Sequence, residues 1–239
     1  MPRMHDLAEA GIFHFFYGQG QSISFTKSWE RTYYWLGRKE KDTVQFPLRT
    51  YTSELVSYYT LALSSENLVL SFLALYKILE YFFTSVSENS LHQRIRELLV
   101  APDFVHTRPR KIRELVRQIR QFDTKLEELA SLKLLLSTYF ERTDLRRWVE
   151  EYEKANSHYF TEENVIVGTP MKVDLSDNSI IPNIAVCIYG IRNALVHNKE
   201  GEVSRFIPYT GQEDLFQREV QILLHIAEQL IIKTGKDLA

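Results

Sequence analysis

Apolar side chains recur every three or four residues through most of the chain after Thr50, and this spacing constrains the fold more than any other feature. Such spacing places the apolar positions of each segment on one face of a helix. The clearest run comprises Ile112, Leu115, Val116, Ile119, Phe122, Leu126 and Leu129. The 239 residues also include only 9 Gly and 7 Pro, too few for the frequent turns of a β-sandwich or barrel. We therefore expect an all-α fold, a helical bundle.

The points where this spacing stops divide the chain into segments. The pattern predicts helices over residues 50–62, 68–83, 91–100, 112–129, 132–140, 145–155, 180–197 and 213–233. Between Phe160 and Ser179 the spacing lapses, and residues 165–167 and 171–173 are expected as short extended pieces around a turn. Residues 1–50 carry aromatic clusters without a helical pattern. We expect them to form an irregular N-terminal arm or small appendage on a helical domain of residues 51–239.

The charge balance and the cysteine content exclude several classes of protein. Lys and Arg number 29 against 31 Asp and Glu, a net charge of −2, so no overall basic field indicates a nucleic-acid partner. Cys187 is the single cysteine, and it can form neither an intramolecular disulfide nor a cysteine-based metal cluster. Several histidines are scattered without the spacing of metal ligands: His92, His106, His158 and His225. We expect no metal and no cofactor.

The sequence lacks the pattern of a membrane span or of a secretory signal. The most apolar stretch, residues 68–83, is interrupted by Lys77 and Glu80, and it is shorter than the roughly 20 residues that a span needs. The first ten residues include two acids and no long apolar run. We expect a soluble, cytoplasmic protein without a membrane partner.

Chemistry-bearing residues gather near the end of the predicted helix 180–197, at Arg192, Asn193 and His197. Arg192 shares its helical stripe with the apolar Ile188 and Val196, so it needs a carboxylate or an anion as partner. Asn193 and His197 lie about 100–140° round the same helix, close enough to flank one cleft. An arginine can hold a phosphate and a histidine can move a proton near neutral pH, a set suited to cleaving RNA. A histidine that merely complements the helix dipole is the alternative.

The stretch from Arg192 to His197 resembles the R-x4-H motif of the HEPN family (higher eukaryote and prokaryote nucleotide-binding domains). Residues 72–83 are similar to the aromatic-rich early helix of HEPN proteins in bacterial phage-defence and toxin systems. The order of the helices is similar as well, and the likeness covers roughly residues 50–239. The resemblance implies a HEPN-like helical bundle.

The resemblance also implies a metal-independent endoribonuclease of bacterial defence or stress response, which cuts RNA by attack of the ribose 2′-hydroxyl. His197 would act as general base or acid, Arg192 would hold the scissile phosphate, and Asn193 would position one of them. The implied partners are RNA, a second copy of the chain in a homodimer, and an effector or antitoxin protein. Lys199 stands where many HEPN toxins carry a tyrosine, so toxin-type regulation at that tyrosine is not implied.

Two rival interpretations belong to other classes of protein. One is a catalytically inactive HEPN-like module that binds a nucleotide or a protein and regulates an effector. The other is a structural helical protein in which Arg192 pairs with Glu80 solely for packing. Glu80 lies on a nearly all-apolar helix and needs a partner, which makes it a further candidate for the catalytic site. A surface pair between Glu80 and Lys77 is the alternative.

Basic residues cluster between residues 91 and 120, where eight Lys and Arg stand against three Asp and Glu. Such a local field can guide an RNA backbone even in a chain of balanced charge. The candidates for this role are Arg108, Arg110, Lys111, Arg113 and Arg117. A solvated helix face is the alternative interpretation.

Overall fold

Helices form nearly all of the regular structure that the chain shows, as the apolar spacing predicts. The computed structural model describes residues 49–102, 104, 109–124, 128–166, 169–196 and 213–237. The chain divides into two units, Met1–Trp35 and Leu36–Ala239, and every described residue belongs to the second. The predicted N-terminal appendage of residues 1–50 therefore lies outside the described residues, apart from Arg49 and Thr50.

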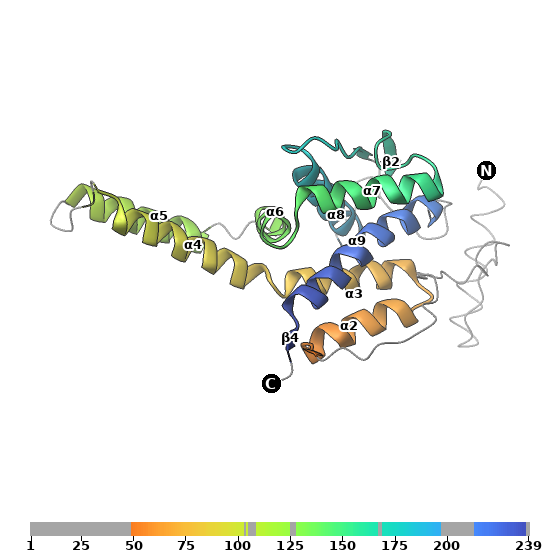
Figure 1. Cartoon of the computed structure of the whole chain (residues 1–239), viewed down its shortest axis with the longest axis horizontal. Helices are drawn as coiled ribbons and strands as arrows, with labels where there is room; N and C mark the ends of the chain where they lie inside the picture. The colour runs from red at the N-terminus through yellow and green to blue at the C-terminus, as the bar shows by residue number, and fades with distance from the viewer. Residues whose placement is uncertain are drawn as a thin grey trace, which may run out of the picture. The chain divides into compact units, whose positions relative to one another are not determined.

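The element order confirms an all-α fold with short strands between and beside the helices (Figure 1). The helices are α2 (Ser53–Ser64), α3 (Leu68–Glu80), α4 (Phe83–Val100), α5 (Pro109–Thr124), α6 (Glu128–Tyr139), α7 (Arg142–Asn156), α8 (Ile180–Val196) and α9 (Glu213–Thr234). The strands are β1 (Arg49–Thr50), β2 (Asn164–Ile166), β3 (Thr169–Met171) and β4 (Lys236–Asp237). β2 pairs antiparallel with β3, which agrees with the extended pieces predicted there, although β3 begins two residues earlier.

The two ends of the described region meet in a second antiparallel pair. β1 pairs with β4, with Arg49 opposite Asp237 and Thr50 opposite Lys236. Nε of Arg49 donates a hydrogen bond of 2.8 Å to the Asp237 carboxylate. The chain thus enters and leaves its helical region side by side.

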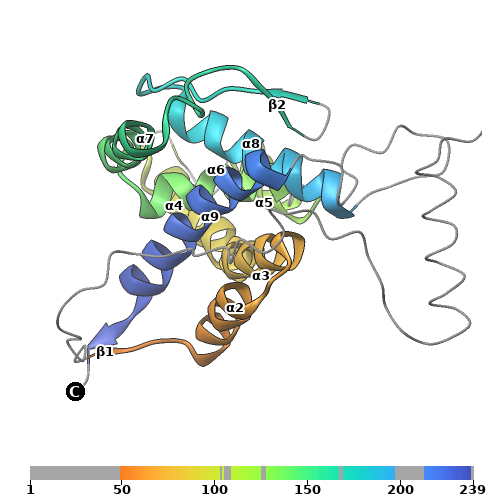
Figure 2. The same cartoon turned by 90° about the vertical axis from the view of Figure 1, so that its right-hand side faces the viewer.

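Helix α3 is the central helix of the core, and α2 and α9 pack against it (Figures 1 and 2). Asn67 caps its start, because the Asn67 side chain accepts hydrogen bonds from the N–H groups of Val69 and Leu70. Phe72 is fully buried, with its ring centroid 5.6 Å from that of Phe216 in α9. Most of the apolar side chains of this helix are therefore buried within the chain itself, although Leu70 is 45% exposed.

A break separates α3 from α4, where the sequence predicts one helix to residue 83 and a new one from residue 91. The regular α3 ends at Glu80, and the Phe82 N–H donates a hydrogen bond back to the carbonyl of Leu79 in a tighter turn.

The segment Leu68–Val100 is long and apolar enough to span a membrane by length and composition. More than half of its most apolar window is buried against other helices, which is typical of a core helix.

Helices α4 and α5 lie side by side as a hairpin that leads away from the other helices (Figure 1). Beyond this hairpin, α6 returns to pack against α4 and α8. The sequence places a helix boundary between residues 129 and 132, but the structure places it earlier, because α5 ends at Thr124 and α6 begins at Glu128. This division matters for the site below, since it places Glu128 at the start of a helix that lies against α8.

Candidate functional site around Arg192

Helix α8 carries Arg192 into the region between α3 and α6. Its neighbours Ile188 and Ile191 are buried, whereas the side chain of Arg192 keeps 19% of its surface exposed. An arginine in such a place packs its aliphatic part among apolar groups while its guanidinium seeks a polar partner. The sequence predicts that this partner is a carboxylate or an anion, and the structure supplies a carboxylate.

The carboxylate is that of Glu128, the first residue of α6. Nη2 of Arg192 lies 3.1 Å from Oε1 of Glu128, and the hydroxyl of Tyr76 in α3 donates a 2.8 Å hydrogen bond to the same oxygen. The guanidinium also lies over the Tyr76 ring, with Cζ 5.8 Å from the centroid, within the range of a cation–π contact. Nη1 of Arg192 donates to Oδ1 of Asn193 at 3.1 Å. These four residues connect α3, α6 and α8, and we call them the Arg192 joint.

The opposite charges of Arg192 and Glu128 compensate each other at a partly buried position. Glu128 keeps 23% of its side-chain surface exposed, close to the 19% of Arg192. Burial raises the pKa of Tyr76, and its hydrogen bond to Glu128 raises that pKa further, so the hydroxyl remains a proton donor. A phosphate bound to Arg192 would have to displace or approach the Glu128 carboxylate, which repels it.

Sequence reasoning missed Glu128 and Tyr76. It placed Tyr76 among the apolar positions of the core helix, although a buried tyrosine hydroxyl needs a hydrogen-bond partner and is itself a signal of a polar contact. Glu128 fell inside the long predicted helix 112–129, where it had no special position. The helix boundary before Glu128 would have singled out this acid, but the apolar spacing of the sequence continues across that boundary.

Glu80, a predicted partner of Arg192, instead forms the pair with Lys77 that the sequence offered as the alternative. It forms an ion pair with Lys77 one turn earlier on α3, and its side chain is 31% exposed against 56% for that of Lys77. This pair follows from the i, i+3 spacing of the two residues at the end of a helix. The carboxylate that the structure places on Arg192 comes from α6 instead.

The other predicted site residues are divided between described and undescribed parts of the chain. Asn193 belongs to the Arg192 joint, whereas His197 and Arg108 lie outside the described residues. On α5, Arg110, Arg113 and Arg117 are exposed, and Lys111 lies 3.9 Å from Glu114. The described members of this basic cluster therefore lie on α5, which packs on α4 in the hairpin and contributes no residue to the Arg192 joint.

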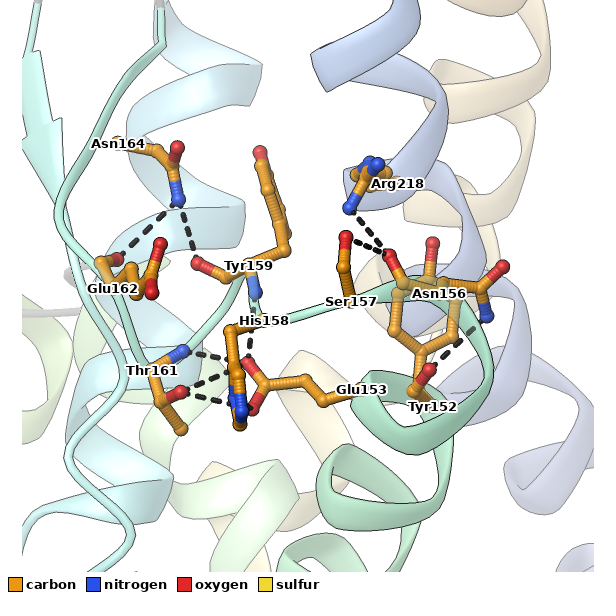
Figure 3. A network of polar contacts seen from close by, with 10 residues as sticks. All are labelled: Tyr152, Glu153, Asn156, Ser157, His158, Tyr159, Thr161, Glu162, Asn164 and Arg218. Carbon is orange, nitrogen blue, oxygen red and sulfur yellow. Dashed lines mark hydrogen bonds and ion pairs between the residues drawn. The ribbon is translucent and has the colours of Figure 1, made fainter.

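A second polar network, around Glu153 of α7, holds the loop that follows this helix (Figure 3). The Glu153 carboxylate accepts hydrogen bonds from the N–H groups of Tyr159 (3.1 Å) and Thr161 (2.8 Å) and from the Thr161 hydroxyl (2.8 Å). Burial by itself raises the pKa of Glu153, but these donors outweigh it and hold the pKa below its usual value. The loop passes through Ser157 with a φ of 64°, a conformation that residues other than glycine rarely adopt.

The same loop reaches a buried acid of α9. The hydroxyl of Tyr159 donates a 2.9 Å hydrogen bond to Glu219, which is only 4% exposed. Burial raises the pKa of Glu219 to about 7. On the face of the Tyr159 ring lies Arg218, with Cζ 5.2 Å from the centroid. Burial also raises the pKa of the nearby Cys187 to about 12, so this thiol is not a nucleophile at neutral pH.

Comparison with known proteins gives one match. Residues 55–232, well over half of the 239, match the family model described as methylamine utilization protein MauJ. No model of a HEPN family matches, so the resemblance drawn from the R-x4-H motif and residues 72–83 is wrong. Six residues with two fixed positions recur by chance in helices, and here the arginine has a packing partner that explains it. No curated protein and no solved structure matches the chain.

Proposed function

Since the chain belongs to the MauJ family, we propose that it serves the use of methylamine as a non-catalytic helical module, which acts by binding another protein. The family description supplies the process, methylamine utilization. The class of function, binding and not catalysis, rests on the residues of the Arg192 joint. The proposal corresponds to the catalytically inactive binding module considered from the sequence, limited to protein binding and without the HEPN assignment.

The single observation that carries the proposal is the 3.1 Å ion pair between Arg192 and Glu128. A ribonuclease of the predicted kind needs Arg192 to hold a phosphate. Here the guanidinium is already compensated by a carboxylate that Tyr76 also holds through a hydrogen bond. Breaking a partly buried ion pair leaves an uncompensated charge behind and costs more than the pair contributes when intact. The arrangement favours a role of Arg192 in packing.

The remaining reactive groups also fit packing better than catalysis. Within the described ranges, no cluster of three or more His, Cys, Asp or Glu side chains that could hold a metal ion occurs. Cys187 is buried as a thiol, and Glu219 is enclosed under Tyr159. The helical surface, by contrast, exposes some large apolar side chains, and apolar side chains gathered into one patch are typical of protein–protein contacts. Examples on α2, α3 and α5 are Val56, Leu63, Leu70, Ile112 and Val116.

Complementation of a deletion strain tests the proposal. We expect deletion of the gene in its source organism to slow growth on methylamine and to leave growth on succinate with ammonium unchanged. A copy carrying His197→Ala should restore growth on methylamine as fully as the unaltered gene does. The control is the same deletion strain with an empty vector.

A direct assay of RNA cleavage separates this proposal from the ribonuclease predicted from the sequence. We expect the purified full chain to leave single-stranded RNA intact, with no more cleavage than the His197→Ala variant shows. A catalytic histidine is worth roughly 10²–10⁴ in rate, so a real activity would be plain on a gel. Cleavage that His197→Ala abolishes, together with failure of that variant to restore growth, would show that the protein is an enzyme and refute the proposal.

A further inference from the structure

Helix α5 presents a row of arginines on one exposed side of the α4–α5 hairpin. Arg110, Arg113 and Arg117 are all exposed, and their spacing of three and four residues places them within a sector of about 60° around the helix. Lys111 and Glu114 lie 3.9 Å apart, and both are partly buried. The exposed positive charge of α5 therefore follows Arg110, Arg113 and Arg117, which we call the arginine row.

Within the ranges that the structure describes, no ion pair links the arginine row to a carboxylate. The arginines that do form ion pairs with described carboxylates lie on other elements: Arg49, Arg146, Arg147 and Arg192. Helix α5 carries five Lys and Arg against two Asp and Glu, a net charge of +3, whereas the whole chain has a net charge of −2. The arginine row is therefore a local positive surface on a chain that is slightly acidic.

The choice of arginine over lysine favours an interface with carboxylates. The Lys and Arg side chains that the structure describes as exposed on the hairpin are all arginines: Arg94, Arg96, Arg110, Arg113 and Arg117. Arginine is enriched and lysine depleted at protein interfaces, because a guanidinium is more weakly hydrated and its fork binds both oxygens of a carboxylate. A row of guanidinium groups about one helical turn apart suits a partner that carries carboxylates at a similar spacing.

An apolar stripe runs beside the arginine row. Ile112, Val116 and Ile119 are each 39–40% exposed, and Val116 lies about 60° from Arg113 around the helix. A partner that contacts the arginine row therefore also meets aliphatic surface. Single-stranded RNA favours aromatic side chains on which its bases stack, so this stripe does not suit it. A helix in a membrane surface buries its apolar face by about 5–10 Å, whereas this stripe is already more than half covered.

We propose that the arginine row and the apolar stripe of Ile112, Val116 and Ile119 together form the docking surface for an acidic protein, whose carboxylates lie beside apolar side chains. The inference rests on the proposed function for the class of partner, a protein, and adds the chemistry of that partner. Charge complementarity argues for the acidic partner, because opposite charges steer the encounter and like charges across a contact exclude wrong partners. The half-covered stripe contributes a smaller apolar term.

Fluorescence anisotropy with a labelled synthetic peptide and the purified full chain tests this docking surface. The probe is a helical peptide of the length of α5, with leucine along one face and glutamate beside it. We expect it to bind, and to bind more weakly as salt rises from about 0.05 to about 0.3 M, whereas a peptide with lysine in place of glutamate should not bind. Arg113→Glu should weaken binding of the acidic peptide about 10-fold. The matched control is Arg142→Glu, at an exposed arginine of α7, which should bind like the wild type.

Val116→Ser tests the apolar part of the docking surface, because it removes aliphatic contact and leaves the charge unchanged. It should weaken binding of the acidic peptide about 3-fold, in proportion to the exposed part of the valine. Val186→Ser on α8, whose valine is 47% exposed, is the control and should have no effect. Circular dichroism of each variant excludes loss of folding as the cause of weaker binding, since exposed side chains contribute little to the core.

Oligouridylate RNA and vesicles of phosphatidylcholine with phosphatidylserine are the competing probes. Tighter binding of either one than of the acidic peptide would overturn the proposal. So would absence of peptide binding, or unchanged peptide affinity in Arg113→Glu or Val116→Ser. The growth test decides the proposed function separately: a chain that restores growth on methylamine but does not bind the acidic peptide would refute the acidic partner alone.

Discussion

At the scale of the residue, Glu219 is the group whose charge should govern the pH dependence of stability. Burial raises its pKa to about 7 in the folded chain, well above the value of an exposed glutamate. Between those two values the folded state holds a proton that the unfolded state has released, so unfolding becomes easier as pH rises. The stabilising contribution is complete below the unfolded pKa and is lost as pH rises through 7.

Glu219→Gln tests this expectation, because a glutamine can still accept the Tyr159 hydrogen bond and carries no charge. The free energy of unfolding of the variant, from urea titrations, should exceed that of the wild type at pH 8 by on the order of 3 kcal/mol and should match it near pH 4.5. The exposed Glu150→Gln on α7 is the control and should leave the pH profile unchanged. Parallel profiles for Glu219→Gln and wild type would contradict the assignment.

At the scale of the element, the Arg192 joint should stabilise the packing of α3, α6 and α8 against one another. A double-mutant cycle with Arg192→Ala and Glu128→Ala isolates this pair from every other contact that either residue makes. For an ion pair with about a fifth of each side chain exposed, we expect a coupling free energy of about 1–2 kcal/mol in urea unfolding.

The exposed pair of Lys77 and Glu80 provides the comparison for this cycle. The Lys77 side chain is 56% exposed, and surface pairs of this kind contribute about 0–1 kcal/mol. A cycle on Lys77→Ala and Glu80→Ala should therefore give the smaller coupling. Equal values for the two cycles would mean that the Arg192 joint is not a structural fastening.

The sequence predicted the elements better than the contacts between them. Helical spacing located the core helices because each of them buries one apolar face. The cap at Asn67 follows from the residue type, since an asparagine side chain favours the N-cap position of a helix. The division after Thr124 was missed, since apolar positions continue across residues 125–129 at nearly the same spacing. Glu128 was missed together with this boundary, because its ion pair with Arg192 depends on how α6 and α8 pack. No local pattern encodes such a meeting.

At the scale of the whole molecule, the family match and the structure together change the meaning of the R-x4-H motif. The motif predicts catalysis when it is considered as a short string of residues. In the folded chain, Arg192 and Asn193 contribute to a contact among three helices, which gives the same residues a structural purpose. The homodimer that the HEPN resemblance implied stays a prediction, and most of the apolar side chains of α3 are buried within the chain itself.

The pairing of β1 with β4 brings the two ends of the helical region together, so the distance between these ends reports whether the region is folded. Arg49 and Asp237 are 188 positions apart in sequence, yet they face each other across one antiparallel pair, where Cα atoms lie only about 5 Å apart. In an unfolded chain of this length the same two positions are separated by many tens of ångströms on average. Resonance energy transfer between a donor and an acceptor fluorophore attached at these two residues would therefore be efficient only while β1 and β4 remain paired.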